Sequence, residues 1–122
     1  MPRTQALALG AGLALTLTAA LAEDTQPIEG TFLQNQPCRG NKSDPEYLRV
    51  KITPQEISYA GGVCSIDESQ QDGKEFSLRV TCKFKSGTVV SDRISFTVRD
   101  SNTLDMAQKD GSYKAVLNRC PS

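Results

Sequence analysis

Residues 75–85, EFSLRVTCKFK, decide the fold of this chain. Every second side chain, from Phe76 to Phe84, is apolar, and the side chains between them are polar or charged. Alternation with a period of two predicts a β-strand that has one buried face and one wet face. Burial on one face only is typical of antiparallel sheets. We therefore expect an antiparallel sheet with this strand near its centre.

The same alternation recurs on both sides of this strand. Residues 47–53 place Leu48, Val50 and Ile52 on one face, and residues 91–100 place Ile94, Phe96 and Val98 on one face. Five shorter segments also have strand character: residues 30–34, 56–60, 63–67, 103–108 and 112–119. Turn residues separate these segments at short intervals, and no helical stripe follows residue 22.

About eight short strands joined by short links predict an all-β fold with an up-and-down strand order. Such a chain either closes into a small barrel or forms two packed sheets. We favour a small antiparallel β-barrel, because closure leaves no exposed strand edges.

The first 22 residues have the features of a cleavable export signal. Arg3 supplies a positive charge, residues 6–21 are almost entirely apolar, and Ala20 and Ala22 are the small residues that a signal peptidase reads. The apolar run is shorter than the ~20 residues that span a bilayer, so we expect cleavage and no stable membrane anchor. We expect the protein in the periplasm of a Gram-negative bacterium or secreted.

Removing 22 of the 122 residues leaves one domain, residues 23–122, of 100 residues. Its 13 basic and 14 acidic residues give a net charge of −1, which offers no reason to expect nucleic acid as a partner. The chain has no histidine, which excludes catalysis by imidazole and histidine-ligated metal sites. The oligomeric state is not indicated.

Four cysteines, Cys38, Cys64, Cys82 and Cys120, lie in the part predicted to be exported. An even number of cysteines in an oxidising compartment predicts two disulfides, with three pairings open. Strand phase favours Cys64 with Cys82, because both point to the core side of neighbouring strands. Cys38 would then pair with Cys120 and tie the first strand region to the last, as in a barrel that closes on itself.

No arrangement of residues predicts an active site. Acids are frequent in the predicted loops, but no spacing selects a catalytic pair, and serines without histidine cannot form a Ser-His-Asp triad. We therefore expect no enzymatic activity, no catalytic residues, no metal and no cofactor.

Basic side chains recur on the predicted outer faces of the strands. Such residues favour solubility. If these strands are adjacent, the same residues form a basic wall that binds an acidic partner. These are Arg49, Lys51, Arg79, Lys83, Lys85, Arg93 and Arg99.

The chain resembles the periplasmic inhibitors of c-type lysozyme in four features. These are the export signal, the small all-β domain, the two expected disulfides and a last strand running from Tyr113 to Cys120. The resemblance lies in the positions of the cysteines and in the succession of short strands. It implies a small antiparallel barrel that protects peptidoglycan by blocking the cleft of a host lysozyme.

In that family a loop bearing serine and a basic residue, in a Ser-Gly-x-Arg-Tyr type of sequence, enters the lysozyme cleft. The nearest stretch here, residues 109–114, has a serine, a glycine, a tyrosine and a base in a different order. The resemblance therefore implies Ser112, Tyr113 and Lys114 as partner-binding residues, with Ser112 and Lys114 facing a carboxylate of the enzyme and Tyr113 beside them.

Three other functions fit the same inventory. A small barrel can carry one apolar molecule, although the inward residues, which include Phe76, Phe84 and Phe96, are numerous enough for us to expect a filled interior. An inhibitor of secreted proteases could use residues 23–30 as a polar arm. The fourth function is that of an accessory protein of the cell envelope.

Overall fold

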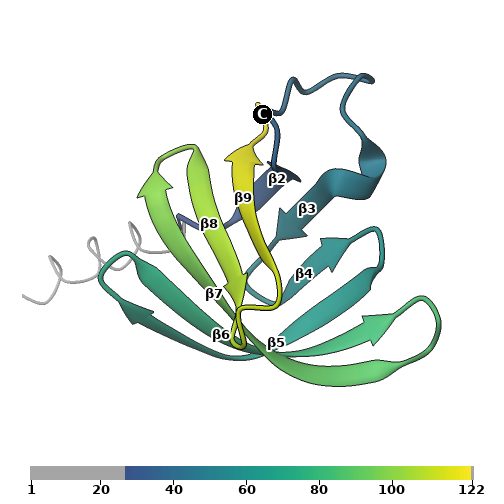
Figure 1. Cartoon of the computed structure of the whole chain (residues 1–122), viewed down its shortest axis with the longest axis vertical. Helices are drawn as coiled ribbons and strands as arrows, with labels where there is room; N and C mark the ends of the chain where they lie inside the picture. The colour runs from purple at the N-terminus through teal and green to yellow at the C-terminus, as the bar shows by residue number, and fades with distance from the viewer. Residues whose placement is uncertain (1–26, 122) are drawn as a thin grey trace, which may run out of the picture.

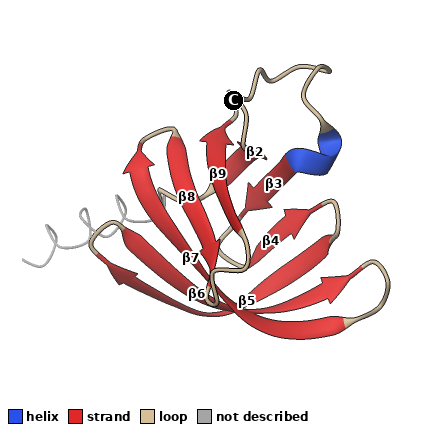
Figure 2. Cartoon of the chain, in the orientation of Figure 1, coloured by secondary structure: helices blue, strands red, loops and turns tan. Residues whose placement is uncertain are grey.

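The computed structural model describes residues 27–121, and the predicted export signal lies outside them. The described chain forms a closed barrel of eight antiparallel strands (Figures 1 and 2). The strands are β2 (Gly30–Gln34), β3 (Arg49–Ile52), β4 (Glu56–Tyr59), β5 (Gly62–Asp72), β6 (Glu75–Phe84), β7 (Val89–Asp100), β8 (Thr103–Gln108) and β9 (Lys114–Arg119). A single 3-10 turn, η1 (Glu46–Leu48), precedes β3.

Each strand pairs with its neighbour in sequence, and β2 pairs with β9 to close the barrel. In this closing ladder Phe32 lies opposite Arg119, and Gln34 lies opposite Leu117. The expected barrel with an up-and-down strand order is confirmed. No helix within residues 27–121 has the length and apolar character needed to cross a bilayer.

Both expected disulfides are present. Cys64 on β5 lies directly opposite Cys82 on β6, and a disulfide joins the two. Cys38, which follows β2, is bonded to Cys120, which follows β9. The second bond therefore joins the chain segments beside the closing ladder, as expected for the remaining pair of cysteines in a barrel that closes on itself.

Strand β5 is longer than expected. The sequence predicted a strand over residues 63–67 followed by a loop, whereas β5 continues to Asp72 and pairs with β6 over its whole length. A register shift between Ile66 and Glu68 interrupts the ladder. The side chains of residues 67–72 are exposed, so this part of the hairpin contributes no core residues and lacks the alternation that marks a half-buried strand.

Other strand bounds differ from expectation, and β9 begins at Lys114, two residues later than predicted. Strand β7 begins at Val89, two residues earlier than predicted. Tyr47 and Leu48 lie in the 3-10 turn instead of a strand, and Tyr47 is 70% exposed. Pro45 precedes this turn with an extended backbone, as expected for a residue at its N-terminal boundary.

The core is densest at one end of the barrel. Phe32, Phe96, Leu104 and Leu117 are 0–1% exposed and come from four different strands. The guanidinium of Arg119 lies over the Phe32 ring, with its Cζ 4.7 Å from the ring centroid. This end, called the packed end below, is therefore filled by large side chains. The opposite end, which carries Tyr59, Phe84 and Tyr113, is called the open end.

Candidate functional site

The open end of the barrel contains a pocket of about 230 Å³. Its apolar wall consists of Val50, Ile57, Cys64, Cys82, Phe84, Val90, Ile94 and Met106. Its polar and aromatic residues are Gln34, Tyr59, Asp92, Gln108 and Tyr113. The expectation that inward side chains fill the whole interior is therefore wrong at this end.

The difference between the two ends follows from side-chain size. The inward positions at the packed end carry Phe32, Phe76 and Phe96, whereas the disulfide between Cys64 and Cys82 occupies two inward positions near the open end. A cysteine side chain is smaller than a phenylalanine side chain, so these two positions fill less of the interior. The pocket lies beside this disulfide, and Cys64 and Cys82 are among the residues that line it.

The polar rim of the pocket follows the inward phase of the strands. Moving along each strand toward the open end, the inward position after Phe32 is Gln34, and the one after Met106 is Gln108. On β7 the inward series Phe96 and Ile94 continues to Asp92. Polar side chains thus occupy the last inward positions of β2 and β8, and Asp92 lies one inward position before Val90 on β7, so the three meet at one end.

Asp92 is the one carboxylate among the residues that line this pocket. Its Oδ2 accepts a hydrogen bond from Gln108 Nε2 at 3.0 Å, and its Oδ1 accepts one from the Arg93 N–H at 2.7 Å. Within residues 27–121, no lysine or arginine side chain lies within ion-pair distance of Asp92. The carboxylate therefore keeps hydrogen-bonding capacity that these contacts leave unused.

Tyr59 is the second titratable group of the pocket. Burial raises the pKa of the Tyr59 hydroxyl, and the negative charge of Asp92 raises it further. The Tyr59 ring packs edge-on against Phe84, with 6.5 Å between ring centroids. The phenol therefore stays neutral in the physiological range and faces the pocket as an aromatic wall with a polar tip.

Of the three residues that the resemblance implied, two lie beside this pocket. The Tyr113 hydroxyl donates a hydrogen bond to Gln34 Oε1, and the Ser112 hydroxyl donates one to Gln108 Oε1 at 2.8 Å. Gln108 in turn donates to Asp92. The turn of residues 109–113, between β8 and β9, is thereby connected to the carboxylate in the pocket.

Lys114, the third residue, is directed differently. It is exposed and pairs with Ala107 in the ladder, and its neighbour Ala115 is buried in the core. Because side chains alternate along a strand, Lys114 projects from the outer face of the barrel. The structure brings Ser112 and Tyr113 to the rim and leaves Lys114 on the outside.

Asp110 lies in the same turn. The side chain and the backbone N–H of Ser112 both lower the pKa of Asp110 below its ordinary value. The Ser112 N–H donates to Asp110 Oδ1 at 2.8 Å, and the Gly111 N–H donates to the Gln108 carbonyl at 2.9 Å. These bonds fix the conformation of the turn and keep an acid at its tip.

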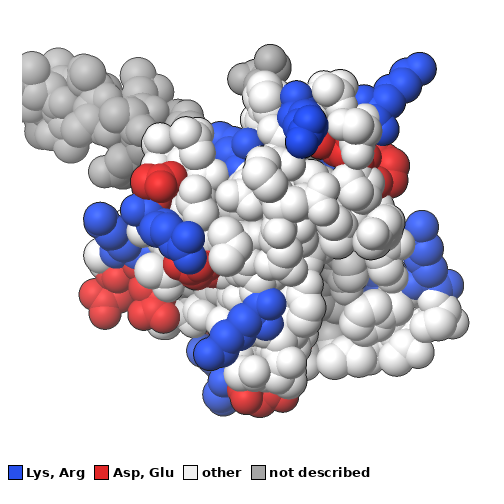
Figure 3. All heavy atoms as spheres, turned by 45° about the horizontal axis from the view of Figure 1, so that its top comes forward, with Lys and Arg blue, Asp and Glu red and all other residues white. Residues whose placement is uncertain are grey.

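The basic outer faces do not merge into one wall. Strands β6 and β7 are adjacent, but β4 and β5 separate them from β3. Three of the seven bases form ion pairs: Arg49 with Glu46 at 3.0 Å, Arg79 with Glu68 at 3.4 Å and Arg99 with Asp105 at 2.5 Å. On the face drawn in Figure 3 the basic groups stand apart, with acids among them.

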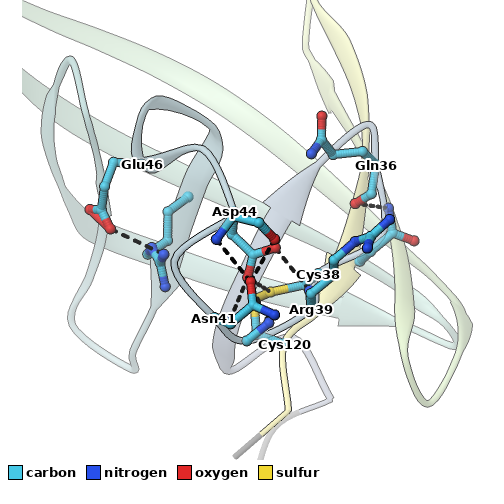
Figure 4. The surroundings of a disulfide bond; sticks show 11 residues. Gln36, Cys38, Arg39, Asn41, Asp44, Glu46 and Cys120 are labelled. Carbon is cyan, nitrogen blue, oxygen red and sulfur yellow. Dashed lines mark hydrogen bonds and ion pairs between the residues drawn. A yellow bond between two sulfur atoms is a disulfide. The ribbon is translucent and has the colours of Figure 1, made fainter.

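A second polar cluster lies beside the disulfide between Cys38 and Cys120 (Figure 4). The Asp44 carboxylate, which is 5% exposed, accepts hydrogen bonds from the backbone N–H groups of Arg39, Gly40 and Asn41. The Arg39 bond is the main cause of a lowered pKa for Asp44, and the other two bonds lower it further. This cluster closes the loop between β2 and η1 on itself, so its role is structural.

Sequence reasoning missed Gln34, Asp92 and Gln108 as site residues. The signal was available, because extending the alternation of the β7 strand from Ile94 back by two residues places Asp92 inward. An acidic residue at an inward position of a strand is unusual, and it indicates the mouth of a barrel or a functional site.

Comparisons with protein-family models, with curated proteins and with solved structures each find no match for this chain. The resemblance to lysozyme inhibitors thus remains a prediction, and functional proposals depend on the geometry of the chain itself.

Proposed function

We propose that this protein is an exported binding protein that holds a small apolar molecule in the open end of its barrel. The single observation that carries this proposal is the pocket of about 230 Å³ with an apolar wall and a polar rim. Ligand sites in proteins are concave and mainly apolar, and a few placed polar groups orient the ligand in them. The pocket has this composition.

The volume sets the size of the ligand. An apolar cavity of about 150 Å³ accommodates a benzene molecule. A pocket of about 230 Å³ therefore suits one ring, or an alkyl chain of similar volume, with a short substituent. Larger amphiphiles such as long-chain lipids do not fit inside it.

Substitutions at two valines of nearly equal exposure test the proposal. Val90, which is 41% exposed, lines the pocket, whereas Val63, which is 42% exposed, does not. Purified oxidised protein is incubated with an envelope extract, washed and denatured, and the released small molecules are identified by mass spectrometry. We expect a molecule in nearly equimolar amount from the wild type and from Val63→Trp, and little from Val90→Trp, because the indole fills the pocket.

Recovery of no bound molecule from the wild type would contradict the proposal. Equal recovery from the Val90→Trp protein would contradict the assignment of the site.

A second candidate function is inhibition of c-type lysozyme, which the barrel and the turn of residues 109–113 favour. A turn held by its own hydrogen bonds loses little conformational entropy on binding, which is an advantage for a cleft-blocking loop. Lys114 is exposed immediately after this turn, where it can face an acidic cleft.

The test is the activity of a c-type lysozyme in the presence of increasing amounts of the oxidised protein. We expect full inhibition near equimolar ratio and weaker inhibition, by about tenfold or more, for Lys114→Ala. Lys83→Ala, which removes an exposed base from β6, is the matched control and retains inhibition. No inhibition at a large molar excess would exclude this function.

A further inference from the structure

We propose that the ligand of the open-end pocket carries a cationic amine next to its apolar part, and that Asp92 binds this amine. The inference rests on the proposed function, that the pocket binds a small molecule, and adds the chemical class of that molecule. The charge of Asp92, its hydrogen-bonding capacity and the aromatic residues that line the same pocket point to this class.

The charged group that lines the pocket is negative. Asp92 lines the pocket, and no lysine or arginine is among the lining residues. The Asp92 side chain is partly buried, and a ligand that covers it removes its remaining hydration, which is costly unless a positive charge or several hydrogen-bond donors compensate for the loss. A bound ammonium group would supply both the charge and up to three donors.

The existing partners of Asp92 leave room for such a group. Each of its two oxygens accepts one hydrogen bond, from Gln108 Nε2 and from the Arg93 N–H. A carboxylate has about four acceptor positions, so contacts within residues 27–121 use about half of them. The two existing bonds also hold the carboxylate in place, so little ordering is required when the ligand binds.

Aromatic rings in the pocket wall favour the same ligand class. Tyr59, Phe84 and Tyr113 all line the pocket. Ring faces attract cations, with the largest effect where water is excluded. An amine at Asp92 would lie among these rings, while the apolar part of the ligand packs deeper against Ile57 and Ile94.

A metal ion is a weaker explanation of the same carboxylate. Within residues 27–121, no group of three histidine, cysteine, aspartate or glutamate side chains is positioned to hold a metal. Hard cations require several oxygen ligands, and one carboxylate with two glutamine side chains does not satisfy that need.

Three probes that share a phenylethyl group and differ in the charge of their polar end test the inference. They are 2-phenylethylammonium, 2-phenylethanol and 3-phenylpropanoate, and their dissociation constants are measured by NMR titration of the oxidised protein at neutral pH. We expect the ammonium to bind roughly ten- to hundredfold more tightly than the alcohol, as charge-assisted hydrogen bonds allow. The carboxylate probe should bind most weakly, because it meets Asp92.

Asp92→Asn should remove the preference for the ammonium and leave the affinity for 2-phenylethanol within about twofold of the wild type. Asp72→Asn, an exposed acid at the far tip of the hairpin between β5 and β6, is the control and should retain the preference. If the Asp92→Asn protein does not fold, the affinities of the wild type for the three probes still show whether the pocket prefers a cationic amine.

The outcomes separate the two proposals. Equal affinity of the wild type for the ammonium and the alcohol would overturn the inference about charge while supporting a small-molecule pocket. Binding of none of the three probes at millimolar concentration would count against the pocket function itself.

Discussion

At the scale of the residue, strand alternation alone indicates that the Asp92 side chain points inward. It continues the inward series of β7, and the structure places its carboxylate in a pocket with aromatic neighbours. What phase could not predict is the empty space around it. That space depends on the sum of side-chain volumes at one end of the barrel, where two inward positions carry the cysteines of a disulfide.

Asp44 determines how the loop beside the disulfide between Cys38 and Cys120 responds to acid. Its pKa in the folded protein is lowered, first by the Arg39 N–H and then by those of Gly40 and Asn41. Because the folded pKa is below the ordinary value, the stabilisation is complete above the unfolded pKa, close to 4, and is lost as the pH falls through the folded pKa.

Asp44→Asn should therefore unfold at a lower temperature than the wild type at neutral pH. The difference should shrink as the pH falls below about 4, because the wild-type carboxylate then becomes protonated. Thermal unfolding followed by circular dichroism at a series of pH values measures this difference. A difference that does not depend on pH would show that the charge of Asp44 is not the cause.

Gly62 is a position where the backbone itself requires glycine. A Cβ at Gly62 would clash with the carbonyl oxygen of Lys83 and lie 2.9 Å from the Cα of Phe84, both on β6. Gly62→Ala should cost about 1–3 kcal/mol of unfolding free energy, as overpacked sites do. Gly61→Ala is the control, because its nearest neighbour is the Tyr59 ring, a side chain that can move. Urea unfolding of both variants checks this prediction, and equal stability would contradict it.

At the scale of the element, the alternation of residues 75–85 was sufficient to predict β6 and its inward face, and the phase of Cys64 on the preceding strand favoured the disulfide to β5. The far half of β5 was not predictable in the same way. Both faces of residues 68–72 are exposed, so their side chains carry no pattern that distinguishes a paired strand from a loop. Pairing with β6 is what holds them extended.

Strand β9 stabilises the packed end through Arg119. Its guanidinium donates hydrogen bonds to the carbonyls of Pro27 at 2.5 Å, Glu29 at 2.6 Å and Ser101 at 2.9 Å, and it lies over the Phe32 ring. These contacts join the entry to β2, the turn between β7 and β8, and the closing ladder.

Arg119→Lys should destabilise the fold by about 1–3 kcal/mol, because an ammonium group cannot match several divergent acceptors and stack on the ring at the same time. Arg93→Lys, at an exposed position on β7, should change the stability by less than about 0.5 kcal/mol. Chemical denaturation of both variants provides the comparison. Equal stability of the two would show that the Arg119 contacts contribute little.

At the scale of the whole molecule, the barrel has two unlike ends. Large aromatic and aliphatic residues fill the packed end, and the open end holds a pocket whose rim connects to the turn of residues 109–113. Closure of the barrel and the cysteine pairing were predictable, because phase and strand order constrain them. The asymmetry was not, because alternation shows which way a side chain points and not whether its neighbours leave space.

The two disulfides should contribute unequally to stability. The bond between Cys38 and Cys120 spans 82 residues and the bond between Cys64 and Cys82 spans 18. In the chain-entropy model, replacing the first pair by serines should cost roughly 4.5 kcal/mol and replacing the second roughly 3 kcal/mol. Guanidinium unfolding of the two double variants measures the order, and a larger loss for the Cys64 and Cys82 pair would contradict it.

The central claim is that the open end of the barrel is a ligand site, and NMR mapping tests it most directly. The ¹⁵N-labelled oxidised protein is titrated with 2-phenylethylammonium and the backbone amide shifts are followed. The account predicts saturable shifts that cluster at Tyr59, Asp92, Gln108 and Tyr113, with the amides of Phe32 and Leu104 at the packed end unchanged. Shifts centred on the packed end, or no saturable shifts at all, would contradict it.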